Sequence, residues 1–263
     1  MKINIVLLAI FFTQFSFTQN KIKKEIEETY KTSLKFGKPV NGKVESKITK
    51  FYNDSGNVIK LITETFDEWA FNPEPIITNL YNTDNKVVET SYLNLDGSLI
   101  QKSIFEYDSK GNNIEYNIYN YEGDLIIKWE FKYDYNNRII EELRHDSDGI
   151  YKGIYSYESK EKKVIKKYQN DLFFNQVEYN FDKNGNEIEI KTYNSNYELI
   201  SKTTKKYDSN NNLIEEINLN GNELFKYTYN YSAFNKFNQW TVKTIYINNK
   251  IEKTIIRKLE YKY

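Results

Sequence analysis

A short motif recurs along most of this chain and constrains its fold more than any other feature. An aromatic residue is followed by Asp or Asn, and Gly or Asn often stands at the fifth position, as in residues 107–112 (YDSKGN). The Asp or Asn side chain can accept hydrogen bonds from backbone amides two residues on, and Gly or Asn tolerates a left-handed backbone. This chemistry is typical of a tight turn between antiparallel strands.

The motif occurs eight times, with its first residues 24 to 29 positions apart. A repeat of this pitch indicates one supersecondary unit used many times. The acidic residues of the motif could alternatively be metal ligands or catalytic groups, but their recurrence with the turn favours the turn role. The eight occurrences begin at Tyr52, Tyr81, Tyr107, Tyr133, Tyr157, Phe181, Tyr207 and, in degraded form, Tyr231.

Each unit has a second turn signal near its middle, such as Asp96-Gly97 or Asn248-Asn249. Between turns, apolar and polar residues alternate, which predicts strands with one apolar and one charged face. Two strands per unit give about sixteen strands over the eight units. In residues 125–133, Leu125, Ile127, Trp129, Phe131 and Tyr133 are expected to face one way and Lys128, Glu130 and Lys132 the other.

We therefore predict an all-β fold of antiparallel β-hairpin repeats that coils into an elongated or partly closed β-strip. Open twisted sheets rarely exceed ~10 strands without curling. A bare aromatic face would also promote aggregation, so it should pack on itself or enclose a narrow interior. Residues 71–75 (FNPEP) are expected to be a loop insertion that lengthens the first interval.

The N-terminus has the pattern of a secretory signal peptide, predicted to cover residues 1–18. Lys2 precedes the apolar run 5–12, and small or polar residues follow. The alternative is a buried N-terminal strand. With no cysteine to carry a lipid and no second long apolar run, we expect a protein that is secreted, periplasmic or at the cell surface, without a transmembrane anchor.

Residues 19–263 are predicted to form a single β-repeat domain. An irregular N-terminal hairpin is expected over 19–51, followed by about eight repeats over 52–263. The spacing of Ile22, Ile26, Tyr30 and Leu34 fits either a helix stripe or a strand face, and two long strands are favoured. Gly37-Lys38-Pro39 and Asn41-Gly42 mark the loop.

Composition limits the classes of partner. Residues 19–263 hold 36 basic and 37 acidic side chains, so the chain has no excess positive charge to attract nucleic acid. Without cysteines its stability must come from burial and backbone pairing. The chain is rich in aromatic residues, with 24 Tyr, 16 Phe and 3 Trp. Their rings could stack on sugars or form a packed core, and a packed core is favoured.

No catalytic, cofactor or metal site is predicted. His145 stands beside Asp146 and Asp148 and could be a base or a metal ligand, but one histidine does not make a clustered site, and an exposed turn residue is favoured. The two aspartates resemble the start of a calcium loop whose later ligands are missing. Two carboxylates suffice for a glycosidase, so this alternative stays open. The polar face that holds Glu115, Asn117, Lys128 and Glu130 leaves room for recognition.

The repeated Y-D-x-x-G-N followed by apolar residues resembles the YD repeats of the Rhs family, and the resemblance covers residues 52–263. Related repeats build the hairpin-wound shells of Rhs toxins, of the C component of Tc toxins and of teneurins. Residues 237–241 and 257–261 are similar to the terminal unit of small exported repeat proteins of the Bacteroidetes type. Eight units are few for a shell, and no effector follows them. MORN-type repeats fit less well because their pattern is richer in glycine.

The resemblance implies an exported, non-enzymatic scaffold that binds a carbohydrate or a protein at the cell surface. Two alternatives remain: a secreted carbohydrate-active enzyme, and a structural or immunity-like partner of a secreted Rhs-type system. The expected partner is a glycan or a surface protein, with no nucleic acid and no cofactor. The sequence leaves the oligomeric state open.

Overall fold

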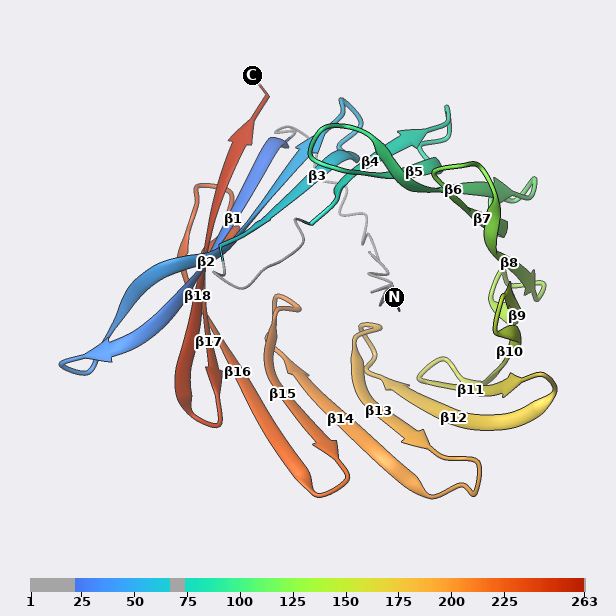
Figure 1. Cartoon of the computed structure of the whole chain (residues 1–263). Helices are drawn as coiled ribbons and strands as arrows, with labels where there is room; N and C mark the ends of the chain where they lie inside the picture. Colours follow the sequence, from blue (N-terminus) through green and yellow to red (C-terminus); the bar gives the residue numbers. More distant parts are fainter. Residues whose placement is uncertain (1–21, 67–73, 263) are drawn as a thin grey trace.

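The chain forms a closed ring of antiparallel strands (Figure 1), seen in a computed structural model that describes residues 22–66 and 74–262. No helix occurs in these described residues. The eighteen strands are β1 (Ile22–Lys35), β2 (Lys38–Tyr52), β3 (Val58–Thr65), β4 (Ile76–Tyr81), β5 (Val87–Leu93), β6 (Leu99–Tyr107), β7 (Asn113–Asn120), β8 (Leu125–Tyr133), β9 (Ile139–Asp146), β10 (Gly149–Ser159), β11 (Lys162–Gln169), β12 (Leu172–Phe181), β13 (Glu187–Tyr193), β14 (Leu199–Tyr207), β15 (Leu213–Asn220), β16 (Glu223–Phe234), β17 (Trp240–Ile247) and β18 (Lys250–Tyr261).

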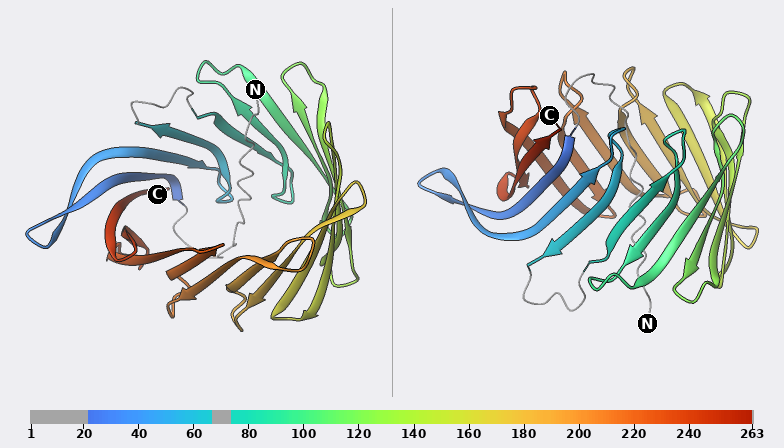
Figure 2. Two further views of the ribbon diagram at one scale, coloured as in Figure 1. Left: turned by 60° about the horizontal axis from the view of Figure 1, so that its bottom comes forward. Right: turned by 90° about the horizontal axis from the view of Figure 1, so that it is seen from above.

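Each strand pairs with its neighbours in sequence, and the first strand pairs with the last. β1 and β18 run antiparallel from Ile22↔Tyr261 to Lys31↔Lys253, which closes the ring. The tilted strands follow one another around the wall in Figure 2. The shortest ladder joins β3 to β4 through only two residue pairs, Lys60↔Thr78 and Leu61↔Ile77.

The prediction of an elongated or partly closed β-strip was therefore wrong. The all-β class, the antiparallel hairpins and the number of strands agree with the sequence, because eight two-strand units and the opening hairpin make eighteen. Closure removes both sheet edges, whose unpaired N–H and C=O groups would otherwise invite aggregation. The predicted signal peptide (residues 1–18) and most of the predicted loop insertion lie outside the described residues.

The motif turns have the predicted chemistry. Asp108 Oδ1 accepts hydrogen bonds from the backbone amides of Lys110 (2.9 Å) and Asn112 (2.8 Å). Gly111, the fifth residue of the motif, has φ = 83°. The same pair of bonds caps the turns at Asn53, Asn82, Asp134, Asp182 and Asp208.

Two of the eight predicted turns were misplaced. Tyr157 lies inside β10, which continues to Ser159 before a two-residue turn. Tyr231 lies inside β16, and the turn is capped instead by Asn235, which accepts bonds from the amides of Phe237 and Gln239. In both places the residue after the tyrosine (Glu158 or Ser232) is not the Asp or Asn that caps a turn elsewhere, so the strand runs on.

Most of the motif tyrosines bond to the backbone of the preceding strand. The hydroxyl of Tyr133 donates to the carbonyl of Asn113 (2.6 Å), and Tyr107 and Tyr207 do the same toward Val87 and Glu187. Tyr157 and Tyr231 also make this bond, although they do not start a turn. Burial raises the pKa of these hydroxyls above its usual range, so they stay protonated and can donate.

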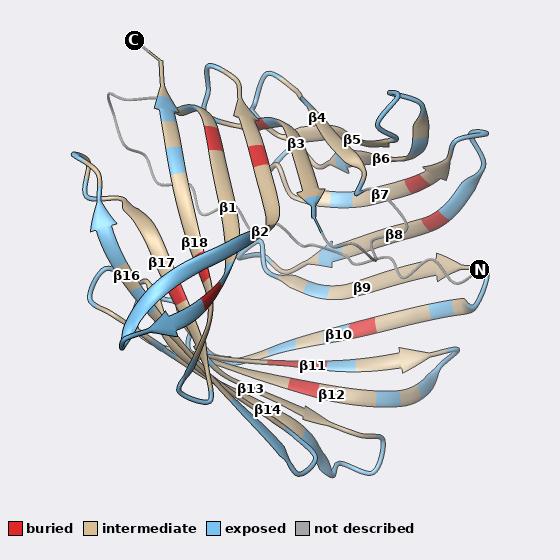
Figure 3. Cartoon of the chain, turned by 60° about the vertical axis from the view of Figure 1, so that its left-hand side comes forward, coloured by how far each residue is buried: buried red, intermediate tan, exposed pale blue. Residues whose placement is uncertain are grey.

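The wall encloses no packed core. Most described side chains are only partly buried, as the tan colouring of Figure 3 shows, and no large side chain among them is fully buried. The accessible surface of the chain is 17820 Å², whereas a compact protein of this mass would expose about 12,000 Å². The interpretation of the aromatic face as a packed core was therefore wrong. The buried apolar residues are Val58, Ile118, Ile127, Val164, Ile165 and Val177.

Removing one tyrosine hydroxyl should weaken the wall measurably. We expect Tyr133→Phe to lower the free energy of unfolding by about 1 kcal/mol, because the carbonyl of Asn113 loses its donor. The measurement is urea unfolding followed by circular dichroism. Tyr121→Phe is the matched control, since this ring is 67% exposed and its hydroxyl bonds only to the adjacent Glu122. Equal midpoints for both variants would contradict the fastening role.

Candidate functional site

The aromatic face of the sheet lines the inside of the ring. Burial is the main cause that raises the pKa of Tyr116 and Tyr179 and lowers that of Lys163. On the opposite face, a hydrogen bond is the main cause that lowers the pKa of Glu115 (from Asn117) and Glu141 (from Lys132). A side chain inside a closed ring is surrounded by wall, whereas an outward one meets water, so the first set points inward.

A platform of aromatic rings lies on the inner face of β6, β7 and β8. Cross-strand register places Phe105, Tyr116 and Trp129 side by side, and Phe131 follows Trp129 on the same face. The rings of Tyr116 and Trp129 are 5.8 Å apart and inclined by 17°, and those of Trp129 and Phe131 are 6.1 Å apart and inclined by 6°. Nearly parallel neighbours of this kind form a broad apolar surface.

Charged groups adjoin this platform on β9. The guanidinium of Arg144 lies 5.9 Å from the Trp129 ring and 4.5 Å from the Tyr151 ring, and it is paired with Asp146. Glu142, two residues earlier, accepts a hydrogen bond from the Tyr155 hydroxyl (2.5 Å).

Gly153 stands opposite Glu142 in the ladder, and a Cβ there would lie 2.6 Å from the carboxylate. The glycine thus leaves room for the carboxylate on the inner wall. The inner face therefore offers ring faces, a cation and an acid within one region.

A second cluster of charged residues lies on the inner face at the seam, which is where β1 pairs with β18. Glu25 on β1 is only 6% exposed; Lys50 Nζ lies 3.2 Å from it, and the Tyr52 hydroxyl donates to it at 2.7 Å. Burial raises the pKa of Glu25, but Lys50, Glu27, Tyr52 and Arg257 together outweigh burial and lower it. Burial is the main cause that raises the pKa of Glu27. Lys50 Nζ also lies 4.0 Å from Glu27, so the two carboxyl groups face the same cation.

The inner charges were missed by the sequence prediction of one apolar and one charged face. Glu25, Glu142 and Arg144 alternate correctly with outward residues, but they occupy positions that elsewhere hold aromatic side chains. One sequence signal could have found them: two opposite charges spaced two residues apart, such as Arg144 and Asp146, lie on the same face of a strand and can pair there. Other inward cations lie over aromatic rings. The distance from the cation to the ring centre is 4.2 Å for Lys163 and Tyr179, 5.3 Å for Lys243 and Trp240, and 4.0 Å for Arg257 and Trp240.

The histidine prediction needs correction. His145 lies within β9 and not in a turn, and its Nε2 is 3.2 Å from Glu130 on the outer face. Its neighbour Asp146 points inward to Arg144, so the two do not form a joint site. Asp148 lies in the turn and donates its amide to Asp146. Within 22–66 and 74–262, no three His, Cys, Asp or Glu side chains are grouped so that they could hold a metal ion.

The outer face carries ladders of paired charges. Lys128 lies 2.9 Å from Glu115 and 3.3 Å from Glu130, and Asn117 also donates to Glu115, so the polar face singled out in the sequence is one network. Similar ladders centre on Glu141, Glu189 and Glu215, each between two lysines. Each of these four acids is the third residue of its strand, and the pairs present charge on the outside of the wall.

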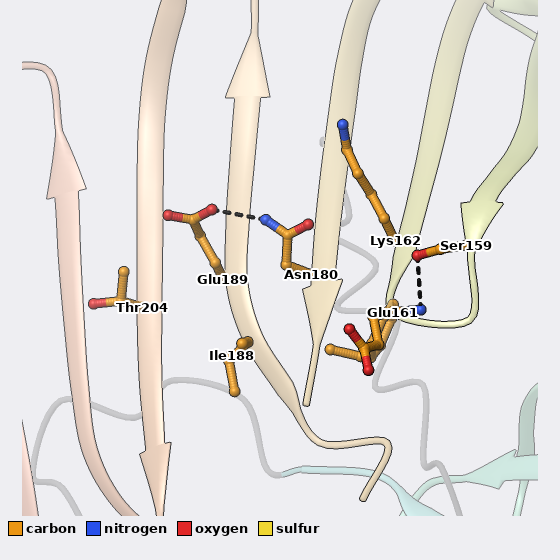
Figure 4. A pocket seen from close by; sticks show the side chains of 8 residues that line it. Ser159, Glu161, Lys162, Asn180, Ile188, Glu189 and Thr204 are labelled. Atoms are coloured by element: carbon orange, nitrogen blue, oxygen red, sulfur yellow. Dashed lines mark hydrogen bonds between the residues drawn. The ribbon is translucent and has the colours of Figure 1, made fainter. Parts of the chain in front are cut away.

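The described surface has hollows, two of which are lined by polar side chains. One, of about 570 Å³, is shown in Figure 4; in it Asn180 donates to Glu189 (2.8 Å), which is also paired with Lys191 and Lys202. The other, of about 900 Å³, lies at the base of the β1–β2 hairpin and is lined in part by Lys31, Thr32 and Lys253. The polar groups at the centre of the first hollow are already satisfied by one another.

Comparisons with known proteins do not assign the chain to a family. No family profile matches it, and no curated protein matches it. Solved structures similar to this chain include a porin-like protein from Bacteroides uniformis, with 12% identity over 92% of this chain and 98% of that chain and a TM-score of 0.45. A porin-like protein from Bacteroides vulgatus has 14% identity over 71% of this chain and 94% of that chain, with a TM-score of 0.43. The Photorhabdus luminescens Tc holotoxin pore has 15% identity over 81% of this chain and 11% of that chain, with a TM-score of 0.32. Similarity at these scores carries no inference about function. No described helix is long and apolar enough to cross a bilayer.

The outer ladders predict a specific acid response. Lys191, then Lys202, bind Glu189 and lower its pKa to about 2, from a usual value of 4.5. Because the folded-state pKa lies below the unfolded value, this stabilisation is present above about pH 4.5 and is lost as the pH falls toward about 2. Glu189→Gln should therefore be less stable than the parent at pH 7, and the difference should shrink between pH 4.5 and 2.

The readout is the urea midpoint across this pH range, and Glu223→Gln, at an exposed strand end, is the matched control. A constant difference between Glu189→Gln and the parent at every pH would contradict the role assigned to the ion pairs.

Proposed function

We propose that the protein is an exported, non-enzymatic β-barrel that binds a glycan or a polypeptide against its inner wall. The observation that carries this proposal is the aromatic platform of β6–β8, which faces the interior together with Arg144 and Glu142. Buried platforms of this kind would belong to a core. Here the aromatic side chains line the inside of a barrel without a packed core, so their faces are available to a ligand.

The size of the ring supports a ligand in the lumen. The diameter of a closed barrel grows with the number of strands, and barrels of about 16 strands or more enclose water instead of a packed interior. This wall has eighteen strands and no fully buried large side chain among its described residues. An extended ligand could therefore enter without displacing a core.

The chemistry of the lining fits sugars or extended peptides. Tyr and Trp faces stack on sugar rings and on side chains, and their polar atoms can bond at the same time. Arg144 over Trp129 and Lys163 over Tyr179 add cationic groups next to ring faces. A few fixed polar groups among aromatic side chains are typical of small-molecule and glycan sites.

A non-enzymatic role is favoured because the two neighbouring carboxylates on the inner face, Glu25 and Glu27, already interact with other side chains of the wall. Lys50 Nζ lies 3.2 Å from Glu25 and 4.0 Å from Glu27, and the Tyr52 hydroxyl donates to Glu25. Glycosidase carboxylates are instead separated by about 5–10 Å to flank a sugar bond. A secreted carbohydrate-active enzyme remains the alternative. A role as partner of a secreted Rhs-type system depends on the motif resemblance alone.

We place the working barrel in water outside the cytoplasm. The signal-peptide pattern of residues 1–18 motivates export to the periplasm, the cell surface or the medium. Lys128 and Lys202 point outward, where they pair with Glu115 and Glu189, and each is the fourth residue of a nine-residue strand. A lysine at the lipid face of a membrane barrel costs about 2–4 kcal/mol near the bilayer midplane, so a wall of such residues favours solvation on both faces.

The test is a glycan array and a pull-down with residues 19–263, followed by titration of each hit. We expect Trp129→Ala and Arg144→Gln to weaken binding about tenfold or more, because a buried aromatic contact or charged bond typically contributes 1–3 kcal/mol. Tyr121→Ala, an exposed turn aromatic, is the control and should bind like the parent. Circular dichroism checks the fold. No ligand in either screen, or equal loss in all three variants, would overturn the proposal.

A further inference from the structure

The opening hairpin extends beyond the wall of the barrel. β18 accompanies β1 only as far as Lys31↔Lys253, and β3 accompanies β2 only from Ser46↔Thr65 onward. Past these points the two strands pair with each other alone, up to Lys35↔Lys38. Residues 33–44 therefore form a free two-stranded ribbon, which projects from the ring in Figures 1 and 2. The five residues from Thr32 to Phe36 reach about 16 Å.

The end of this ribbon is apolar and exposed. Phe36 is fully exposed (105%), Leu34 is 56% exposed and Val40 is 37% exposed. These residues contribute nothing to the wall, and their exposure carries a solvation cost in water. An aromatic and two aliphatic side chains gathered at the tip of a projection are therefore suited to an apolar partner.

The turn at the tip uses an unusual residue. Phe36 and Gly37 have φ = 52° and 75°. The same pair of left-handed residues occurs at Asn170-Asp171 and Asn248-Asn249, where Asn and Asp fit this backbone well. A bulky aromatic residue is disfavoured at positive φ. Phe36 therefore stands where the turn alone would favour Asn, which indicates a role for its side chain.

The charge around the tip is of one sign. Residues 33–44 contain Lys35, Lys38 and Lys43 and no acidic residue, whereas the chain as a whole has no net charge. Exposed apolar residues at other turns differ in this respect, because Tyr121, Tyr135 and Leu172 each adjoin an acidic residue. Cations beside exposed aromatic and aliphatic groups match the boundary of an anionic bilayer, where Lys meets headgroups and Phe or Leu enters the acyl region.

We propose that the ribbon docks the barrel on the surface of an anionic phospholipid bilayer, with Phe36 and Leu34 inserted between headgroups. The reach of the ribbon keeps the charged outer wall in water while the tip contacts lipid. This docking does not depend on a ligand in the lumen, so either proposal can fail without the other.

The experiment is co-sedimentation of residues 19–263 with phosphatidylcholine vesicles that contain about one quarter phosphatidylglycerol, and with phosphatidylcholine vesicles alone. We expect binding to the anionic vesicles that weakens as salt rises from about 50 to 500 mM. Lys35→Glu with Lys38→Glu should lower the partition coefficient by at least about 25-fold, since the loss of each lysine costs roughly fivefold and each new carboxylate is repelled in addition. Phe36→Ser should lower it about tenfold.

Matched controls keep the result specific. Tyr135→Ser removes another exposed turn aromatic, and Lys110→Glu with Lys183→Glu reverses two exposed turn lysines on the wall. These variants should bind within about twofold of the parent. Equal binding by the ribbon variants, equal loss in the controls, or equal binding to neutral vesicles would overturn the proposal. A dimer that dissociates in Phe36→Ser and no vesicle binding would overturn it in favour of self-association.

Discussion

The pairing of β1 with β18 is the interaction on which the rest of the barrel depends. Nine residue pairs join segments that lie more than 220 positions apart in the sequence. Without them the sheet would have two open edges and an exposed aromatic face. The same pairing brings Glu25, Lys50 and Arg257 together from β1, β2 and β18. The seam thus has side-chain bonds across it in addition to its backbone ladder.

Because the ring has no packed core, local bonds must supply what burial usually provides. Most of the motif turns are capped by an Asp or Asn side chain, and most of the motif tyrosines bond to a carbonyl of the preceding strand. Charged ladders connect strands on the outside, while rings and cations contact one another on the inside. Side-chain contacts therefore stabilise the sheet on both of its faces.

The sequence determined the local structure well and the closure poorly. Turn positions follow from Asp or Asn with Gly at fixed offsets, and strands follow from a period of two, so the hairpins and their number could be predicted. Closure depends on strand tilt and on the register between residues 22–31 and 253–261, which no local pattern encodes. The prediction placed the aromatic residues on the correct face of the sheet but expected them to be packed in a core. A packed core and an open lumen require the same alternation of apolar and polar residues along each strand, so the pattern does not distinguish them.

The inner charges and the ribbon tip escaped prediction for different reasons. Glu142 has its place on the inner wall because Gly153 stands opposite, and the two are eleven residues apart on different strands. Lys35-Phe36-Gly37-Lys38 was visible in the sequence, but only the lengths of the neighbouring ladders show that this turn stands clear of the wall.

The resemblance of the motif to YD repeats has the same limit. Tyr, Asp and Gly specify a hairpin with an inward hydroxyl, and a hairpin of this kind can be built into rings, strips or shells. The number of units and the seam between the chain ends decide which of these forms, so the motif is evidence for the unit and not for the assembly.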